Sequence, residues 1–337
     1  MPAAALVVLN YEGRDLLDVA LPSMLAQDHP DFEVILVDDG SRDDSVAHVR
    51  ERWPEVRVVA LERNVGVTAA MNRGLAATDA AFVALLNNDV ELDAGWLAAT
   101  IAVLDGDPSC AAATGKMLRF DRRDVIDAAG DLYLASGVAL NRGAGEPDDG
   151  RFDVPEEVFG GCAGATLYRG AALTDVGPFD EALVAYLEDV DWSLRARLRG
   201  WTVRYTPDAR CYHMGGATTG RRPGRFAMLQ RRNHLVLVAK NWPRHQLLSF
   251  GWLVVAYQLV WLLASVRDRR GVEHVRAWAA FARALPAVLT KRRGIQSGLR
   301  IAPPELNRAM HLGLPSSRAA VLALELAPDA ARRRRRV

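Results

Sequence analysis

Short apolar runs alternate with amphipathic stretches over the first 105 residues, and this alternation constrains the fold more than any other feature of the sequence. The apolar runs occupy residues 5–9, 34–37, 56–61 and 81–86. Between them lie stretches in which the apolar residues recur at helical spacing, over residues 16–26, 41–53 and 67–77. Strands that alternate with helices in this way predict an α/β fold with a mostly parallel sheet and helices on both faces.

Polar residues follow each of the four apolar runs. Asn10 follows the first run, Asp38 and Asp39 the second, Asn64 the third and residues 87–89 the fourth. Ligands of such sheets bind outside the carboxyl ends of the parallel strands, where those ends meet at one edge. The sequence therefore predicts a ligand site at this edge.

The fourth run leads into Asn87, Asn88 and Asp89, whose oxygens are of the kind that Mg²⁺ and Mn²⁺ prefer. One protein carboxylate suffices there if the oxygens of a bound diphosphate complete the coordination shell. The alternative is an ordinary Asn/Asp turn. Four other polar features favour the ligand site: residues 38–41, 63–66 and 188–191, and His213. Each taken alone has a simpler interpretation, as a helix cap, a turn or a structural histidine.

Three acids lie together at the predicted start of a helix over residues 189–199. They are Glu188, Asp189 and Asp191. Helix capping is the simple explanation, because the helix dipole favours acids in the first turn. Three carboxylates so close together are unfavourable if buried, however, and one of them is then available as a general base.

Taken together, these motifs resemble those of the family 2 glycosyltransferases, and in particular the rhamnosyltransferase-like branch. They occur in the family's order over residues 4–216, about two thirds of the chain: VLNY (8–11), VDDGS (37–41), NVG (64–66), LNND (86–89), GCAGA (161–165), EDVDW (188–192) and His213. The resemblance implies a GT-A fold, which is Rossmann-like, and an inverting, metal-dependent hexosyltransferase.

The resemblance also implies roles for individual residues, which fall into four groups. The donor nucleotide, a dTDP- or UDP-sugar, would be held by Asn10, Tyr11, Asp38, Asp39, Asn64 and Asn88. Independently of the resemblance, Arg221 and Arg222 follow the glycines at 215 and 216 and are expected to clamp the donor diphosphate, with a solvated basic loop as the alternative. The divalent metal, Mg²⁺ or Mn²⁺, would be held by Asp89 and His213. Asn87 stands where the family's DxD motif has its first Asp, which leaves one carboxylate for the metal. Asp189 would be the catalytic base, with Glu188 as the second candidate, and Gly164 and Trp192 would contact the acceptor.

The segment from residue 230 to residue 337 is predicted to be helical and to associate with the membrane, after a catalytic domain over residues 1–229. Residues 247–265 carry no charge, and basic residues flank them on both sides and end in the run 332–336. This length just reaches that of a membrane-spanning helix, whereas a buried core helix is the alternative. Trp252 and Trp261 are about 13 Å apart along a helix, too close to mark both interfaces. A peripheral or monotopic enzyme on the cytoplasmic face of the inner membrane is expected.

Composition narrows the partners further. A formal net charge of +1 gives no indication of a nucleic-acid partner, and the three separated cysteines support neither a zinc site nor a disulfide framework. No signal peptide is expected, because the first apolar run is short and has no basic leader. The predicted reaction is transfer of a sugar, with rhamnose as one candidate, to a lipid-linked or polysaccharide acceptor of the cell envelope.

Two other functions remain open at this point. A sugar-1-phosphate nucleotidyltransferase would share the parallel sheet and the metal, but residues 10–14 hold a single glycine and a single arginine where such enzymes carry a glycine-rich, basic loop. A non-catalytic, membrane-bound sugar-nucleotide binder is the other alternative. Asp89, Asp189 and His213 argue against it, because a mere binder has no need of a base.

Overall fold

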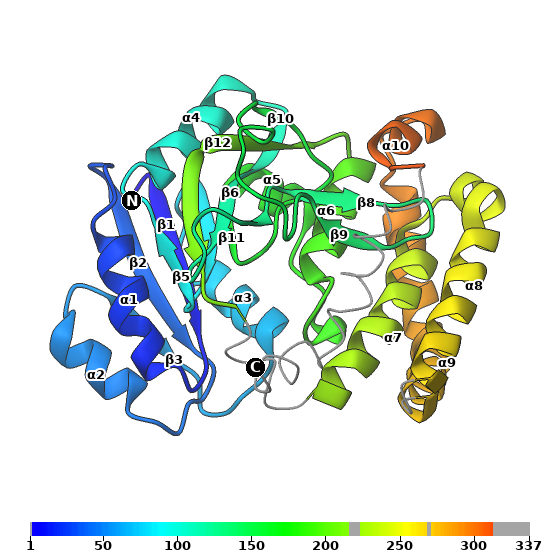
Figure 1. Cartoon of the computed structure of the whole chain (residues 1–337), viewed down its shortest axis with the longest axis horizontal. Coiled ribbons are helices and arrows are strands. Elements are labelled where there is room, and N and C mark those ends of the chain that lie inside the picture. Colours follow the sequence, from blue (N-terminus) through cyan, green and yellow to red (C-terminus); the bar gives the residue numbers. More distant parts are fainter. Residues whose placement is uncertain (1, 216–222, 268–270, 313–337) are drawn as a thin grey trace.

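The parallel part of the sheet is built from the first four strands of the chain, β1 to β4 (Figure 1). The structure is a computed structural model that describes residues 2–215, 223–267 and 271–312. The elements in chain order are β1 (Ala4–Asn10), α1 (Arg14–Leu25), β2 (Phe32–Asp38), α2 (Ser45–Arg52), β3 (Arg57–Ala60), α3 (Val67–Leu75) and β4 (Phe82–Asn87). Strand β1 pairs in parallel with β2 and β4, and β2 pairs in parallel with β3. The predicted alternation of strands and helices is confirmed.

The second half of the sheet is mixed. Its elements are β5 (Val90–Leu92), α4 (Trp96–Gly106), β6 (Cys110–Arg119), β7 (Ile126–Ala128), β10 (Glu156–Glu157), β11 (Ala165–Arg169) and β12 (Thr202–His213). The order across the sheet is β10-β12-β6-β11-β4-β1-β2-β3, with β5 beside β12 and β7 beside β6. Strand β11 runs antiparallel to both β4 and β6. Strands β8 (Asp131–Tyr133) and β9 (Ala139–Asn141) form a separate hairpin.

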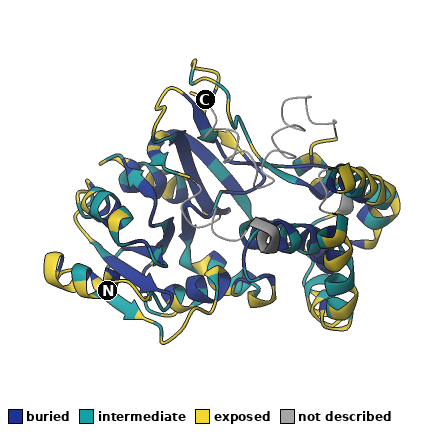
Figure 2. Cartoon of the chain, turned by 60° about the horizontal axis from the view of Figure 1, so that its bottom comes forward, coloured by how far each residue is buried: buried dark blue, intermediate teal, exposed yellow. Residues whose placement is uncertain are grey.

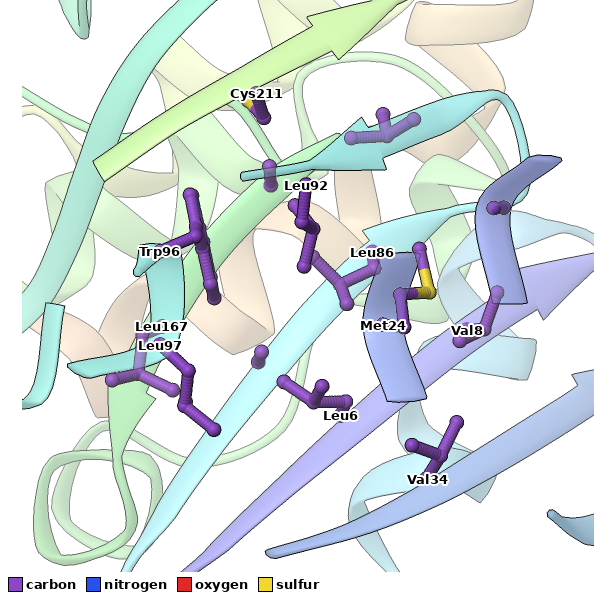
Figure 3. Close-up of a cluster of buried hydrophobic side chains, with 14 of the residues drawn as sticks. Leu6, Val8, Met24, Val34, Leu86, Leu92, Trp96, Leu97, Leu167 and Cys211 are labelled. Carbon is purple, nitrogen blue, oxygen red and sulfur yellow. The ribbon is translucent and has the colours of Figure 1, made fainter. Parts of the chain in front are cut away.

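Helices cover both faces of the sheet, which explains why β1 is apolar on both sides. Leu6 and Val8 pack with residues of α1 and α4, such as Met24 and Trp96, in one cluster (Figure 3). The intervening residues of β1 pack on the other face with α3 and α6 (Glu188–Leu198). A strand that is buried on both faces is expected to read as a continuous apolar run.

A long loop over residues 142–155 joins β9 to β10. Lys116 on β6 ties this loop to the sheet, because its fully buried ammonium group pairs with Asp148 at 2.7 Å and with Asp153. The Tyr205 hydroxyl donates to the carbonyl of Phe152 at 2.7 Å. The loop is therefore fixed against the sheet at two points.

The chain after β12 is helical throughout the described residues. It forms α7 (Pro223–Asn241), α8 (Arg244–Arg267), α9 (Gly271–Ser297) and α10 (Pro303–Ala309). These helices stand beside the sheet (Figure 1), and they carry many exposed residues while the strands are buried (Figure 2). Residues 229 and 230, the predicted domain boundary, lie inside α7, which packs against both α6 and α9.

Candidate active site at the carboxyl ends of the strands

Three polar side chains from the ends of β1, β2 and β4 form one hydrogen-bonded group. The Asn10 amide donates to Asp38 at 2.8 Å, and the Asn88 amide donates to the Asn10 oxygen at 2.7 Å. Ser41 also donates to Asp38, through its hydroxyl at 2.7 Å and its backbone amide at 2.9 Å. A side chain at Gly13 would collide with this group, because its Cβ would lie 2.1 Å from the Asn88 amide. The predicted meeting of strand ends is confirmed for these residues.

Asp39 holds the turn between β3 and α3. Its carboxylate accepts from the backbone amides of Val65 at 2.7 Å and Gly66 at 3.0 Å. Burial raises the pKa of Asp39, while these two amides oppose the shift. Asn64 in the same turn is exposed, and Tyr11 beside Asn10 is partly exposed. Both side chains therefore lie at the accessible rim of the group formed by Asn10, Asp38 and Asn88.

Gly40 allows the loop after β2 to lie close against the loop after β3. Its φ of +69° lies in the left-handed region, and a Cβ there would come within 2.4 Å of the Arg63 backbone. Glycine alone avoids both the strain and the collision. The β2 and β3 loops can therefore touch only with a glycine at this position.

Asp89 and His213 meet at the far end of the same edge. Strands β5 and β12 pair in antiparallel register and set His213 opposite Val90, so the imidazole Nε2 lies 3.4 Å from a carboxylate oxygen of Asp89. The other ring nitrogen, Nδ1, lies 2.7 Å from a carboxylate oxygen of Asp127 on β7. Burial opposes protonation of His213, but its hydrogen bonds to Asp127 and Asp89 raise its pKa to about 10.

Asp89 and His213 suit a divalent metal whose shell a diphosphate completes. Adjacent ligands about 2.1 Å from an octahedral metal lie about 3 Å apart, close to the observed 3.4 Å. Both side chains are at least three quarters buried. Within residues 2–215, 223–267 and 271–312, no three His, Cys, Asp or Glu groups come together as a complete metal site. Asp89 and His213 together could supply only part of a coordination shell.

Asp189 lies in the first turn of α6. Its carboxylate is held by the small-residue segment 161–165, one of the sequence motifs. Its carboxylate accepts from the amide of Ala163 at 3.1 Å and from that of Val190 at 2.8 Å. In the same segment the carbonyl of Gly164 accepts from the backbone amide of Asn87 at 3.0 Å. Residues 163–164 thus link the end of β4 to the carboxylate of Asp189, and burial raises the pKa of Asp189.

Glu188 and Asp131 are buried beside Asp189. Glu188 is 7% exposed and Asp131 is 3% exposed, and one oxygen of each carboxyl group has no hydrogen-bond partner in the structure. Burial and the charge of Asp189 raise the pKa of Glu188 to about 8 and raise the pKa of Asp131 well above its usual range. The Glu188 carboxyl group is therefore largely protonated near neutral pH.

The chain before α6 is strained, and it touches the donor side of the site. Val184, Tyr186 and Leu187 all have φ between +65° and +68°, which is unfavourable for side chains of this kind. A Cβ at Gly66 would lie 3.1 Å from the Val184 side chain. Backbone strain of this kind is concentrated at functional sites, and here it delivers Glu188 and Asp189 to the edge of the sheet.

Two predicted roles need correction, one of a site residue and one of a membrane-helix residue, and two predicted site residues cannot be placed. Trp192 is fully buried, stacks on Phe179 and donates to the carbonyl of Gly177, so its ring belongs to the core and cannot contact an acceptor. Trp261 was considered as a membrane-interface residue, but it is buried. Arg221 and Arg222 lie outside the described residues.

Asp191, the third acid of the motif, has a structural environment. It pairs with Lys240 at 2.7 Å and with Arg195 at 3.0 Å, and Asn241 donates to it at 2.7 Å. Burial alone would raise the pKa of Asp191, but these cations lower it. Asp191 therefore anchors α6 to α7 and is not free to act as a base.

Sequence reasoning missed Asp127, Asp131 and Lys240. The two aspartates lie at either end of the small-residue stretch 128–130, outside every motif, and the local sequence carries no signal for them. Their partners are far along the chain, His213 being 86 residues from Asp127.

The family comparison agrees with this geometry. The model of glycosyl transferase family 2 matches residues 5–173, half of the chain. The chain belongs to glycosyl transferase family 2. The match begins at β1 and covers the ends of β1, β2 and β4 that carry the polar group. Membership of this family favours sugar transfer over both the nucleotidyltransferase and the non-catalytic binder.

Curated relatives of this glycosyltransferase act on glycans. An N-acetylglucosaminyl-diphospho-decaprenol L-rhamnosyltransferase of Mycobacterium tuberculosis is 28% identical over 256 residues, which are 69% of this chain and 83% of the relative. A poly-beta-1,6-N-acetyl-D-glucosamine synthase of Staphylococcus epidermidis is 24% identical over 235 residues. This chain spans 55% of the length of that synthase.

Solved structures confirm the predicted GT-A fold. A mannosyltransferase from Pyrobaculum calidifontis, in complex with GDP-Man and Mn²⁺, matches with a TM-score of 0.54 at 18% identity. The match covers 97% of this chain and 87% of the mannosyltransferase, and so includes the C-terminal helices. At this identity the likeness establishes the fold alone.

Proposed function

We propose that this glycosyltransferase is inverting and metal-dependent, and that it transfers a hexosyl unit from a nucleotide diphosphate sugar to an acceptor of the cell envelope. The observation that carries this proposal is the position of Asp189. A buried carboxylate is held by the amide of Ala163 in the segment that also joins the end of β4, next to Asp89. A base and a candidate metal site at one edge of the sheet are what transfer from a nucleoside diphosphate requires.

Asn10, Asp38 and Asn88 would hold the nucleoside, with Tyr11, Asp39 and Asn64 around it. The network already fixes the orientation of the Asn10 and Asn88 amides. Asp89 and His213 would hold the metal, which when bound neutralises the charge that develops on the departing nucleoside diphosphate. Arg221 and Arg222 are proposed to contact the diphosphate.

Asp189 would remove the proton from the acceptor hydroxyl. That oxygen attacks the anomeric carbon as the bond to the diphosphate oxygen breaks, and the proton stays on the carboxyl group. One displacement inverts the anomeric configuration, so no covalent intermediate is needed. The raised pKa of Asp189 suits a general base, because it brings the carboxylate closer to the working pH. Gly164, next to Ala163, would contact the acceptor.

The rhamnosyltransferase-like branch suggests the substrates. The relative from Mycobacterium tuberculosis is named for transfer of L-rhamnose to a diphospho-decaprenol acceptor. We propose a dTDP- or UDP-sugar donor, with rhamnose as the first candidate sugar, and a lipid-linked or polysaccharide acceptor. At 28% identity this assignment concerns the class of substrate.

Helix α8 supports a location at the membrane surface. Among the described residues it is the one helix long and apolar enough to cross a membrane, and only 17% of its most apolar window is buried. Its outward face is apolar, whereas its buried face carries three polar residues: Gln246, Gln258 and Ser265. Val254 and Trp261 are also buried, so the inner face is mixed, but an apolar outward face is unlike that of a helix exposed to water. We propose a peripheral or monotopic enzyme on the cytoplasmic face of the inner membrane.

Helix α7 spans the proposed boundary between the catalytic part and the membrane-associating part. The proposed division remains a catalytic part before residue 230 and a membrane-associating part after it, but α7 is shared between the two. Lys240 and Asn241, at the end of α7, contact Asp191 of the catalytic part.

A donor screen tests the proposed function. Thermal unfolding of the full chain would be followed with UDP-, dTDP- and GDP-sugars, with and without Mn²⁺. A true donor at 100 times its dissociation constant should stabilise the fold by about 2.7 kcal/mol. Slow release of free nucleoside diphosphate should accompany binding. If no nucleotide sugar shifts the unfolding temperature in the presence of Mn²⁺, the proposal is wrong.

A further inference from the structure

We propose that Asp127 is a positioning residue, which fixes the imidazole of His213 so that Nε2 faces the metal site at Asp89. This inference rests on the metal use proposed above. Asp127 belongs to none of the sequence motifs, and it lies on the short strand β7.

The two ring nitrogens of His213 have different partners on opposite sides of the ring. Nδ1 lies 2.7 Å from an oxygen of Asp127, and Nε2 lies 3.4 Å from an oxygen of Asp89. A carboxylate can only accept, so Nδ1 must carry the proton of this hydrogen bond. With the Nδ1 proton held by Asp127, the proton that leaves when a metal binds is the one on Nε2, and the lone pair this frees is on the nitrogen that faces Asp89. Asp127 therefore selects the tautomer that a metal ligand needs.

Asp127 is not placed to bind the same metal directly. Its hydrogen bond to Nδ1 puts it across the ring from Nε2 and Asp89. Its second oxygen lies 3.8 Å from Nε of Arg119, which holds the carboxylate from the side of β6. The role that fits both contacts is orientation of the histidine.

The sheet holds these residues in place by its register. Strand β6 lies between β7 and β12, with Met117 opposite Ala128 and with Arg119 opposite His213. The amide of Phe120 also donates to the carbonyl of His213 at 2.9 Å. Arg119 and His213 are thus paired directly, and Asp127 lies at a register shift between Ile126 and Ala128, both of which pair with β6. The strands on both sides therefore position the two side chains before any ligand binds.

The test is the affinity of the full chain for Mn²⁺, measured by electron paramagnetic resonance of the free ion in the presence of UDP. Loss of a partner that orients a histidine ligand typically weakens metal binding 10- to 100-fold. We expect this loss for Asp127→Ala and a smaller loss for Asp127→Asn, because an amide oxygen can still accept from Nδ1. Asp124→Asn is the matched control, since Asp124 lies three residues away with a largely exposed side chain.

Two further readouts separate positioning from a general effect on folding. The unfolding temperature of each variant and the affinity for UDP in EDTA should match those of the unmodified chain. Mn²⁺ affinity unchanged in Asp127→Ala would overturn the role of Asp127 and leave the proposed function intact. If the unmodified chain does not bind Mn²⁺, the proposed metal dependence fails and this inference fails with it.

Discussion

The three acids at the start of α6 have different chemical roles because each carboxyl group has different hydrogen-bond and ion-pair partners. Asp189 accepts from two backbone amides, Asp191 pairs with Lys240 and Arg195, and one oxygen of Glu188 has no partner. The sequence predicted three acids at a helix start, but it could not show which of them is available as a base. Availability depends on partners from α7 and from the segment 160–164, which lie outside α6 in the sequence.

The first prediction concerns the base. Asp189→Asn should reduce the rate of sugar transfer by about 10²–10⁴-fold, because the amide cannot accept the proton of the acceptor. Donor affinity should change little, since Asp189 acts on the acceptor. The measurement is transfer rate and donor binding in parallel, with Glu188→Gln as the matched variant. An inactive Glu188→Gln beside an active Asp189→Asn would move the base by one residue.

The second prediction concerns the pH dependence of stability. The folded-state pKa of Glu188, about 8, lies above its ordinary value of 4.5, so the group stabilises the fold at low pH and this contribution is lost as pH rises through 8. The side chain in the variant Glu188→Gln cannot ionise, so the variant should not lose this stability as pH rises. The free energy of unfolding is measured by chemical denaturation at pH 5 and pH 9. From pH 5 to pH 9, that of the variant should increase by at least about 1 kcal/mol relative to that of the unmodified chain. A constant difference would contradict a protonated Glu188.

Most elements of the N-terminal half could be predicted, whereas the connections between distant strands could not. The predicted strands 5–9 and 34–37 became β1 and β2 with one or two more residues at each end. Period and turn chemistry are local, so they are visible in the sequence. The pairing of β7 with β6, which carries Asp127 to His213, depends on register across the sheet, and three residues of β7 carry no such signal.

At the scale of elements, α6 depends on its ion pairs with α7. Lys240 is 1% exposed and pairs with both Asp180 and Asp191. Removing one partner of a buried pair leaves an uncompensated charge, which costs about 3–5 kcal/mol.

Lys240→Met should therefore lower the free energy of unfolding by about 3 kcal/mol, because Arg195 still pairs with Asp191. Lys291→Met is the control. Lys291 also pairs with Asp180, but its side chain is 45% exposed, and its loss should cost less than about 1 kcal/mol. Urea denaturation measures both. Equal losses in the two variants would show that Lys240 has no special role.

At the scale of the whole molecule, one face consists of exposed apolar residues on a single helix. Along α8 they follow a spacing of three and four residues: Leu248, Trp252, Val255, Leu259, Leu263 and Val266. The uncharged run in the sequence predicted this helix, but only the structure separates the exposed Trp252 from the buried Trp261.

The membrane prediction follows from this stripe. The double variant Trp252→Glu, Leu259→Glu should lose most binding to anionic liposomes in a flotation assay, because both side chains would have to bring a charge into the bilayer. Val154→Glu changes an equally exposed apolar residue in the β9–β10 loop, and it should bind as the unmodified chain does. If the double variant floats like the Val154 control, α8 does not contact the membrane.

The central claim is that Asp189 and the metal residues perform a single inverting displacement. The most direct measurement is the anomeric configuration of the transferred sugar, by NMR of the product that the full chain forms from a donor found in the nucleotide-sugar screen. We predict the configuration opposite to that of the donor, with formation of the product abolished by EDTA and strongly reduced by Asp189→Asn. A product that retains the donor's configuration, or one formed at the full rate by Asp189→Asn, would contradict the claim.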